Sequence, residues 1–169
     1  MSRHRILSDQ RGASAAELAL ILPLLLLLLF GGLEAGHFIW TQHKLTEAVR
    51  DGARYASRLD AQTFCPSLNT VARDRIMLLT RTGQLENAAA KSLVPGWEKE
   101  KVVVTPFCDK FVDTGIYADL ANGEKGPIVI VEARNVNYPS LFFHTGVIVP
   151  LTNGPLSRNA KASAAVIGL

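Results

Sequence analysis

Residues 18–33 form an apolar run without a charged or strongly polar side chain, and a single carboxylate, Glu17, immediately precedes it. A helix rises 1.5 Å per residue, so about 20 residues cross the roughly 30 Å hydrocarbon core of a bilayer. That length is available if the helix extends past Glu34 to Trp40. A carboxylate at the centre of such a helix costs about 2.5 to 3.5 kcal/mol on insertion, and less near the interface. We therefore expect a membrane-spanning helix whose Glu17 is retained for assembly, with a partner chain supplying the counter-charge.

The positive charge of the chain is concentrated before this run. The whole chain carries a formal net charge of +3 and has a pI of about 9.0. Residues 1–12 hold three arginines and one aspartate, so most of the excess lies there. Positive charge beside a first apolar segment marks the cytoplasmic side, which places the C-terminal part outside the cytoplasm. The basic residues therefore indicate how the chain is oriented in the membrane, and we expect no nucleic-acid partner.

The 169 residues leave room for one modest domain after the anchor. Past Trp40 we expect the helix to continue into water, because apolar or small residues recur there at spacings of three and four. This stripe, suited to packing against a sheet or another helix, consists of Leu45, Val49, Gly52, Ala56 and Leu59.

The remaining residues predict an α+β domain. Residues 66–96 indicate two shorter helices, the first stopping near Gly83 and the second covering residues 85–94. Three β-rich segments follow, at residues 102–105, 128–136 and 160–167, separated by Gly, Pro and Asn. The apolar residues 140–150 are either a fourth strand or a loop covering the sheet. The predicted fold is a long N-terminal membrane-spanning helix packed on a small antiparallel sheet.

The chain has two cysteines, Cys65 and Cys108, and both fall in the part expected outside the cytoplasm. In an oxidising compartment an isolated pair favours a disulfide, and no Cys-x-x-Cys spacing indicates redox or zinc chemistry. Such a bond would close a loop for which the chain-entropy model gives roughly 4 kcal/mol. The alternative is two buried thiols.

Three kinds of N-terminus fit an apolar segment of this type. A cleaved secretory signal needs two small residues spaced two apart just after the run, and residues 30–36 contain no such pair. A plain signal anchor explains the hydrophobic length and the positive flank. It gives no account of Gly12 followed five residues later by Glu17. A prepilin-type leader explains both features.

Gly12, Ala13 and Glu17 resemble the site cut by prepilin peptidases, which cleave after a glycine on the cytoplasmic side of the apolar segment. The similarity extends through residues 11–20, RGASAAELAL, and through the later stretch 48–56, AVRDGARYA. Over roughly residues 10–57 the chain resembles TadE-like proteins, the minor pseudopilins of tight-adherence (Tad, or Flp) pili.

The resemblance implies a type IV pilin-like fold in three parts. Residues 1–12 would be a leader removed by cleavage between Gly12 and Ala13. Residues 13–60 would be the N-terminal transmembrane and extended helix that retains Glu17, and residues 61–169 a periplasmic or extracellular α+β domain. The implied partners are a prepilin peptidase, a major Flp-type pilin, a second minor pseudopilin and the bacterial inner membrane.

Motifs for enzyme chemistry are missing from the sequence. It contains no Gly-rich phosphate loop, no His-Glu-x-x-His and no Gly-x-Ser-x-Gly. His37 and His43 are six residues apart, which does not place them on one helix face as metal ligands. We expect no enzyme, metal, cofactor or small-molecule substrate. Two alternatives stay open: a single-pass envelope scaffold or sensor, and a tethered periplasmic enzyme.

Overall fold

The computed structural model describes residues 10–87, 89–108, 127–142 and 156–166. The chain divides into two units, Met1–Phe38 with Ser140–Val149, and Ile39–Pro139 with Pro150–Leu169. One helix, α1 (Gln10–Ser57), runs through the first unit into the second. The second unit holds the other elements: η1 (Ala61–Thr63), α2 (Thr70–Thr82), η2 (Lys99–Lys101), β1 (Val102–Phe107), β2 (Ile128–Asn137) and β3 (Ser157–Ala165).

α1 has two different surfaces along its length. From Ser14 to Leu33 every residue is exposed, whereas one stripe is buried from Thr41 onward. The buried stripe includes Leu45, Val49 and Ala56, the spacing predicted from the sequence. The helix continues through Pro23 without a break. The same helix therefore presents an apolar surface in its first half and packs on a domain in its second half.

α2 is bounded by residues that satisfy its free backbone groups. The side chain of Asn69 accepts hydrogen bonds from the backbone N–H groups of Val71 and Ala72, at 2.9 and 3.4 Å. At the other end Gly83 has φ +74°, and its N–H donates to the carbonyl of Leu79. A left-handed residue of this kind ends many helices, and glycine adopts it without steric strain. The predicted stop near Gly83 is confirmed.

The sheet has three antiparallel strands in the order β1-β2-β3. Val104 lies opposite Val131, and Val131 lies opposite Ala162 on the other side. Burial alternates along β2, so that Val129, Val131 and Ala133 face the core and the residues between them face away. The three predicted strands are confirmed, with β3 beginning three residues earlier than expected.

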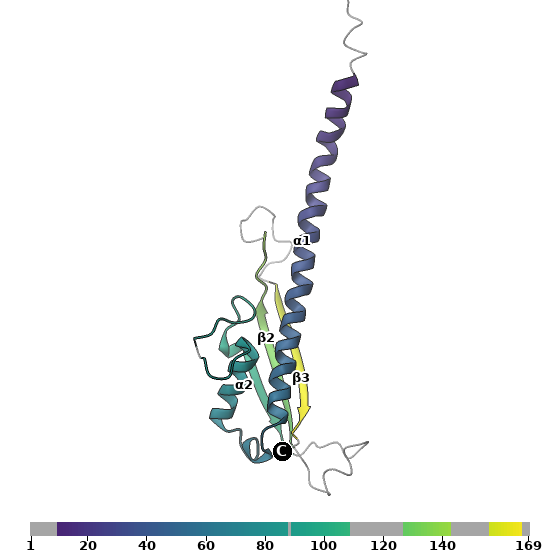
Figure 1. The fold of residues 1–169 in the computed structure, drawn as a ribbon. Helices are drawn as coiled ribbons and strands as arrows, with labels where there is room; N and C mark the ends of the chain where they lie inside the picture. Colours follow the sequence, from purple (N-terminus) through teal and green to yellow (C-terminus); the bar gives the residue numbers. More distant parts are fainter. Residues whose placement is uncertain (1–9, 88, 109–126, 143–155, 167–169) are drawn as a thin grey trace, which may run out of the picture. The chain divides into compact units, whose positions relative to one another are not determined.

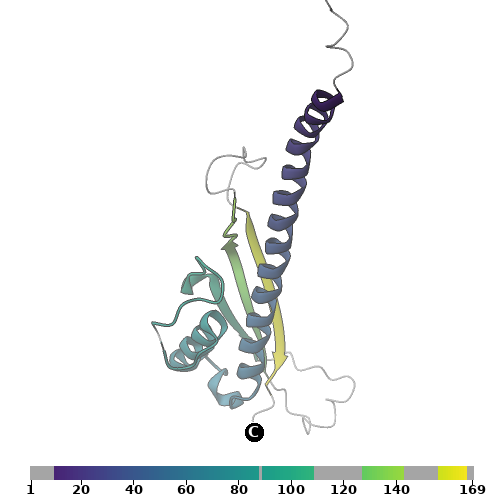
Figure 2. The same ribbon diagram turned by 45° about the horizontal axis from the view of Figure 1, so that its top comes forward.

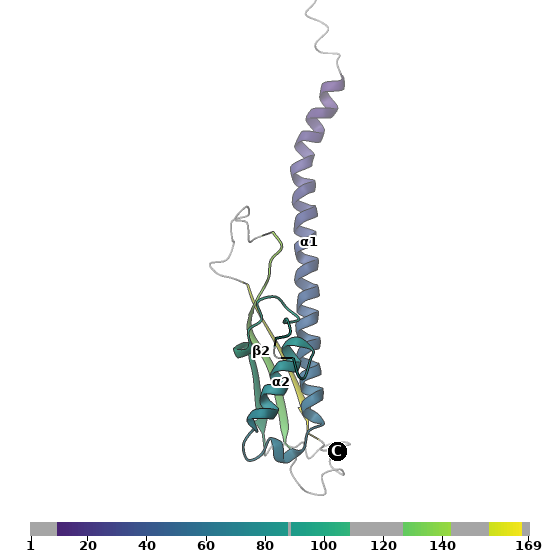
Figure 3. The same cartoon turned by 60° about the vertical axis from the view of Figure 1, so that its left-hand side comes forward.

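Within the second unit, the C-terminal part of α1 and the whole of α2 lie on the same face of the sheet (Figures 1 to 3). The core between them contains Trp97 and Phe64 together with valines of β1 and β2. A Cβ added to Gly52 would overlap the Oγ1 atom of Thr80 on α2 and lie 3.5 Å from a methyl group of Val131 on β2. Gly52 therefore lies where the backbone of α1 closely approaches α2 and β2. The predicted α+β class is confirmed, and the arrangement is consistent with a pilin-like fold.

The second helix predicted for residues 85–94 is wrong over the residues that the structure describes there. The segment forms turns and bends instead. The side chain of Asn87 accepts from the backbone N–H of Ala89, and the hydroxyl of Ser92 donates to the carbonyl of Val94. Such local side-chain bonds compete with helical ones. Of the segment 140–150, predicted as a strand or a loop, residues 140–142 are not a strand and residues 143–150 lie outside the described part.

Candidate functional site

The expected processing site lies in the first turns of α1. Gly12, Ala13 and Glu17 all belong to this helix, and Gly12 and Glu17 are exposed. A Cβ added to Gly12 would meet no atom within 4 Å. Five residues of helix separate Gly12 from Glu17 by about 7.5 Å along the axis. Of the expected leader, residues 1–9 lie outside the described part of the chain.

No cation pairs with Glu17 among the side chains that the structure describes. The carboxylate stands one residue before the apolar run, at the end that the arginine-rich segment precedes. A carboxylate at this depth gains from a counter-charge because lipid solvates it poorly. Glu17 is exposed on α1, so a positive group from another molecule can reach it.

The apolar run is exposed in the part of the chain that the structure describes. Its 18-residue window has a mean hydropathy of 2.4, and none of that window is buried. In water, apolar patches of more than a few hundred Å² are rare on soluble proteins. The helix is long and apolar enough to cross a membrane, and its surface fits lipid or other apolar helices. The large side chains exposed on it are Leu18, Leu20, Ile21, Leu22, Leu24, Leu25, Leu26, Leu27, Leu28, Leu29, Phe30 and Leu33.

Trp40 stands at the far end of this surface. Its ring is 52% exposed, and the Nζ atom of Lys44 lies 4.4 Å from the ring centroid. Tryptophans gather at membrane–water interfaces because the ring is amphipathic, and a lysine there reaches its charge into water. The distance along the helix from Leu18 to Trp40 is about 33 Å, close to the thickness of a hydrocarbon core.

The structure adds a contact that the sequence did not reveal, between the apolar helix and the segment 140–142. The Oε2 atom of Glu34 accepts a hydrogen bond from the backbone N–H of Leu141 at 3.1 Å. The rings of Phe30 and Phe142 meet edge to face, with centroids 5.1 Å apart. No local sequence pattern links Glu34 to Leu141, because the two residues are 107 positions apart.

Cys65 and Cys108 are joined by a disulfide, with Cα atoms 5.9 Å apart. Cys65 follows η1, and Cys108 follows β1. The bond ties the chain after α1 to the end of an edge strand. It stabilises the second unit and adds no reactive thiol, since the chain has no other cysteine.

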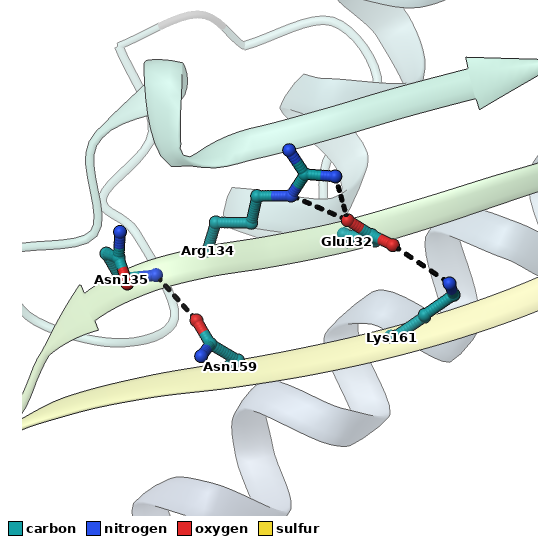
Figure 4. A network of polar contacts seen from close by, with 5 residues as sticks. All are labelled: Glu132, Arg134, Asn135, Asn159 and Lys161. Carbon is teal, nitrogen blue, oxygen red and sulfur yellow. Dashed lines mark hydrogen bonds and ion pairs between the residues drawn. The ribbon is translucent and has the colours of Figure 1, made fainter.

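A polar cluster lies on β2 and β3 (Figure 4). Glu132 accepts from Nε of Arg134 at 2.6 Å and pairs with Nζ of Lys161 at 3.1 Å. The hydrogen bonds from Arg134 and then Lys161 lower the pKa of Glu132. The side chain of Asn159 accepts from the N–H of Asn135, whose φ of +50° belongs to a bulge in β2.

This cluster lines a cavity of about 400 Å³ but offers no catalytic group. A carboxylate with a lowered pKa and two cations already bound to it is a weak general base. Among the described residues, no three His, Cys, Asp or Glu side chains come together as metal ligands do. The cluster therefore acts as an ion-pair network that joins two strands.

Residues 12–54 match the family model described as TadE-like protein. The matched segment contains Gly12, Ala13, Glu17, the whole apolar run and most of the packed half of α1. Neither a curated protein nor a solved structure gives a match.

Proposed function

We propose that the chain is a minor pilin-like subunit, a pseudopilin, of the Tad pilus machine, because residues 12–54 match the TadE-like family model. A prepilin peptidase would cut it between Gly12 and Ala13, and the mature chain would assemble through its N-terminal helix. TadE-like pilus components are in general not enzymes, and the chain is a membrane-anchored protein associated with the pilus.

The observation that carries the proposal is Glu17, exposed and without a described counter-charge beside an uncovered apolar helix surface. Cleavage would create a new positive group, the amine of Ala13, close to this depth of the membrane. The amine of one subunit and the carboxylate of the next would neutralise each other as apolar helices stack. Such a pair neutralises two charges that would each be unfavourable in lipid.

The proposed topology follows from the charge distribution. The arginine-rich residues 1–12 would be the cytoplasmic leader, residues 13–60 the spanning and extended helix, and residues 61–169 the periplasmic domain. A disulfide between Cys65 and Cys108 suits an oxidising compartment outside the cytoplasm. The proposed partners are the peptidase, a major Flp-type pilin, a second minor pseudopilin and the inner membrane.

Glu17→Gln tests the assembly role, because it removes the charge and keeps the shape. The variant inserts in the membrane like wild type, since a neutral side chain is easier to place beside lipid. Breaking one partner of a buried pair costs about 3 to 5 kcal/mol, so co-purification with pilin subunits should fall by more than tenfold.

Glu47→Gln is the matched control, since Glu47 is an exposed glutamate on the packed half of the same helix. This variant should co-purify with pilin subunits as wild type does. Equal co-purification of the Glu17 variant and wild type would contradict the assembly role. It would favour the alternative of a solitary membrane-anchored scaffold or sensor.

A further inference from the structure

We propose that the segment at residues 140–142 is a second membrane-contact element, which Glu34 holds on the spanning helix and which inserts Leu141 and Phe142 among the acyl chains of the outer leaflet. The inference rests on the membrane-spanning role of α1 and is independent of peptidase cleavage and pilus assembly. The proposal adds a second contact with lipid, made by the residues that follow β2.

The depth of the segment follows from its two contacts on α1. With Glu17 at the inner boundary of the hydrocarbon core, Phe30 lies 13 residues further, about 20 Å along the helix. A core of roughly 30 Å then extends about 10 Å beyond Phe30. Phe142 touches the ring of Phe30, so its ring lies at hydrocarbon depth. Glu34, about one helical turn after Phe30 in the sequence, is still inside the outer boundary of the hydrocarbon core.

The hydrogen bond to Glu34 resolves the main difficulty of placing irregular backbone at that depth. A peptide N–H without an acceptor is costly in lipid, so non-helical segments enter a membrane only where their polar groups are satisfied. The N–H of Leu141 donates to Oε2 of Glu34, so this backbone group has an acceptor. Glu34 is only 8% exposed, so the carboxylate is shielded where it binds the segment. The Oε2 atom of Glu34 thus supplies the acceptor that the N–H of Leu141 needs.

What faces outward from the segment is apolar. Leu141 is 53% exposed, a fraction like that of the leucines on the lipid-facing run of α1. The sequence from Leu141 to Pro150 contains no Asp, Glu, Lys or Arg. Phe30, which Phe142 contacts on α1, belongs to the exposed apolar surface of that helix. Continuity with that surface selects acyl chains as the occupant.

A nitroxide on Leu141→Cys measures the environment directly. Cys65 and Cys108 are bonded to each other and leave the new thiol as the labelling site. The full-length protein is placed in vesicles of phosphatidylethanolamine and phosphatidylglycerol. Collisions of the label with oxygen, which concentrates in lipid, are compared with collisions with a water-soluble nickel complex. Labels at Leu25, in the run, and at Leu85, an exposed site after α2, give the lipid and water references.

The expected oxygen-to-nickel ratio at position 141 is close to that at position 25 and several-fold above that at position 85. A water-like ratio at 141 with a lipid-like ratio at 25 would overturn this proposal alone. Low collision rates with both reagents at 141 would show a protein covering and would also overturn it. A water-like ratio at 25 would contradict the membrane span itself, and this inference with it.

The role of Glu34 is tested in the labelled background with two variants. Glu34→Ala removes the acceptor, so the ratio at position 141 should fall several-fold towards that at position 85. Glu34→Gln keeps a carbonyl oxygen in the same place, so it should retain most of the lipid-like ratio. An unchanged ratio in the alanine variant would overturn the role of Glu34 as the holding group.

Discussion

Gly52 shows how a single residue sets the spacing of three elements. It lies on the buried stripe of α1, where an added Cβ would overlap Oγ1 of Thr80 and lie 3.2 Å from the Cβ of the same residue. Thr80 is fully buried, and its hydroxyl is fixed by donating to the carbonyl of Ile76 at 2.7 Å. Neither side can move easily, because the helix backbone and a buried side chain meet directly.

Gly52→Ala should therefore lower the free energy of unfolding by about 1 to 3 kcal/mol, the usual cost of overpacking. Gly36→Ala, on the same helix with open space around it, should leave stability unchanged or raise it by up to about 1 kcal/mol, because alanine favours a helix over glycine. Thermal unfolding of the detergent-solubilised protein, followed by circular dichroism, measures both. The double variant Gly52→Ala with Thr80→Ala should lose less than the sum of its single changes, and strict additivity would contradict the direct contact.

Glu132 is a second single residue that stabilises the fold, and its contribution to the free energy of unfolding depends on pH. Its pKa in the folded protein is lowered by Arg134 and Lys161 from an ordinary value of about 4.5. The unfolded chain binds the proton more tightly, so the stabilisation is complete above that value and is lost as pH falls through the folded pKa. Lys161 is well exposed, so the contribution is at most about 1 kcal/mol.

Glu132→Gln should accordingly be less stable than wild type at pH 7, and the difference should shrink as the pH is lowered below about 4.5. Melting temperatures across this pH range test the sign. A difference that stays constant down to pH 3 would mean that the charge on Glu132 does not stabilise the fold.

At the scale of elements, the disulfide joins regions that no strand pairing connects directly. It joins two cysteines with a sequence separation of 43, and the loop that it closes contains α2 and β1. The chain-entropy model assigns about 4 kcal/mol to a loop of this size. The bond thereby keeps the end of an edge strand near the end of α1 in the unfolded chain as well as in the folded one.

Replacing Cys65 and Cys108 together by serine should lower the free energy of unfolding by about 2 to 4 kcal/mol. Reduction of the wild-type protein should lower its melting temperature in the same direction, and reduction of the double variant should have no effect. A wild-type melting temperature that is insensitive to reductant would contradict a stabilising disulfide.

Across the whole molecule, the features readable from sequence were those with a local period or a local signal. The apolar run of α1, its buried stripe, the stop at Gly83 and the three strands all follow from spacing or from a terminating residue. The helix predicted at residues 85–94 shows the limit of such local signals, because the side chains of Asn87 and Ser92 hydrogen-bond to nearby backbone groups instead.

The candidate site likewise contains residues that the sequence predicts and a contact that it does not predict. Gly12, Ala13 and Glu17 could be selected from sequence because they lie within six residues of one another beside the apolar run. The contact of Glu34 with Leu141 could not, because tertiary folding alone brings those residues together.

The N-terminal residue of the membrane-purified chain tests the central claim most directly. Intact mass and N-terminal sequencing of protein produced with its prepilin peptidase should give a chain that begins at Ala13. Gly12→Ala should keep residues 1–12, and the open space around Gly12 makes a folding defect a poor explanation for that result. A wild-type chain that retains Met1 in the presence of an active peptidase would contradict the account.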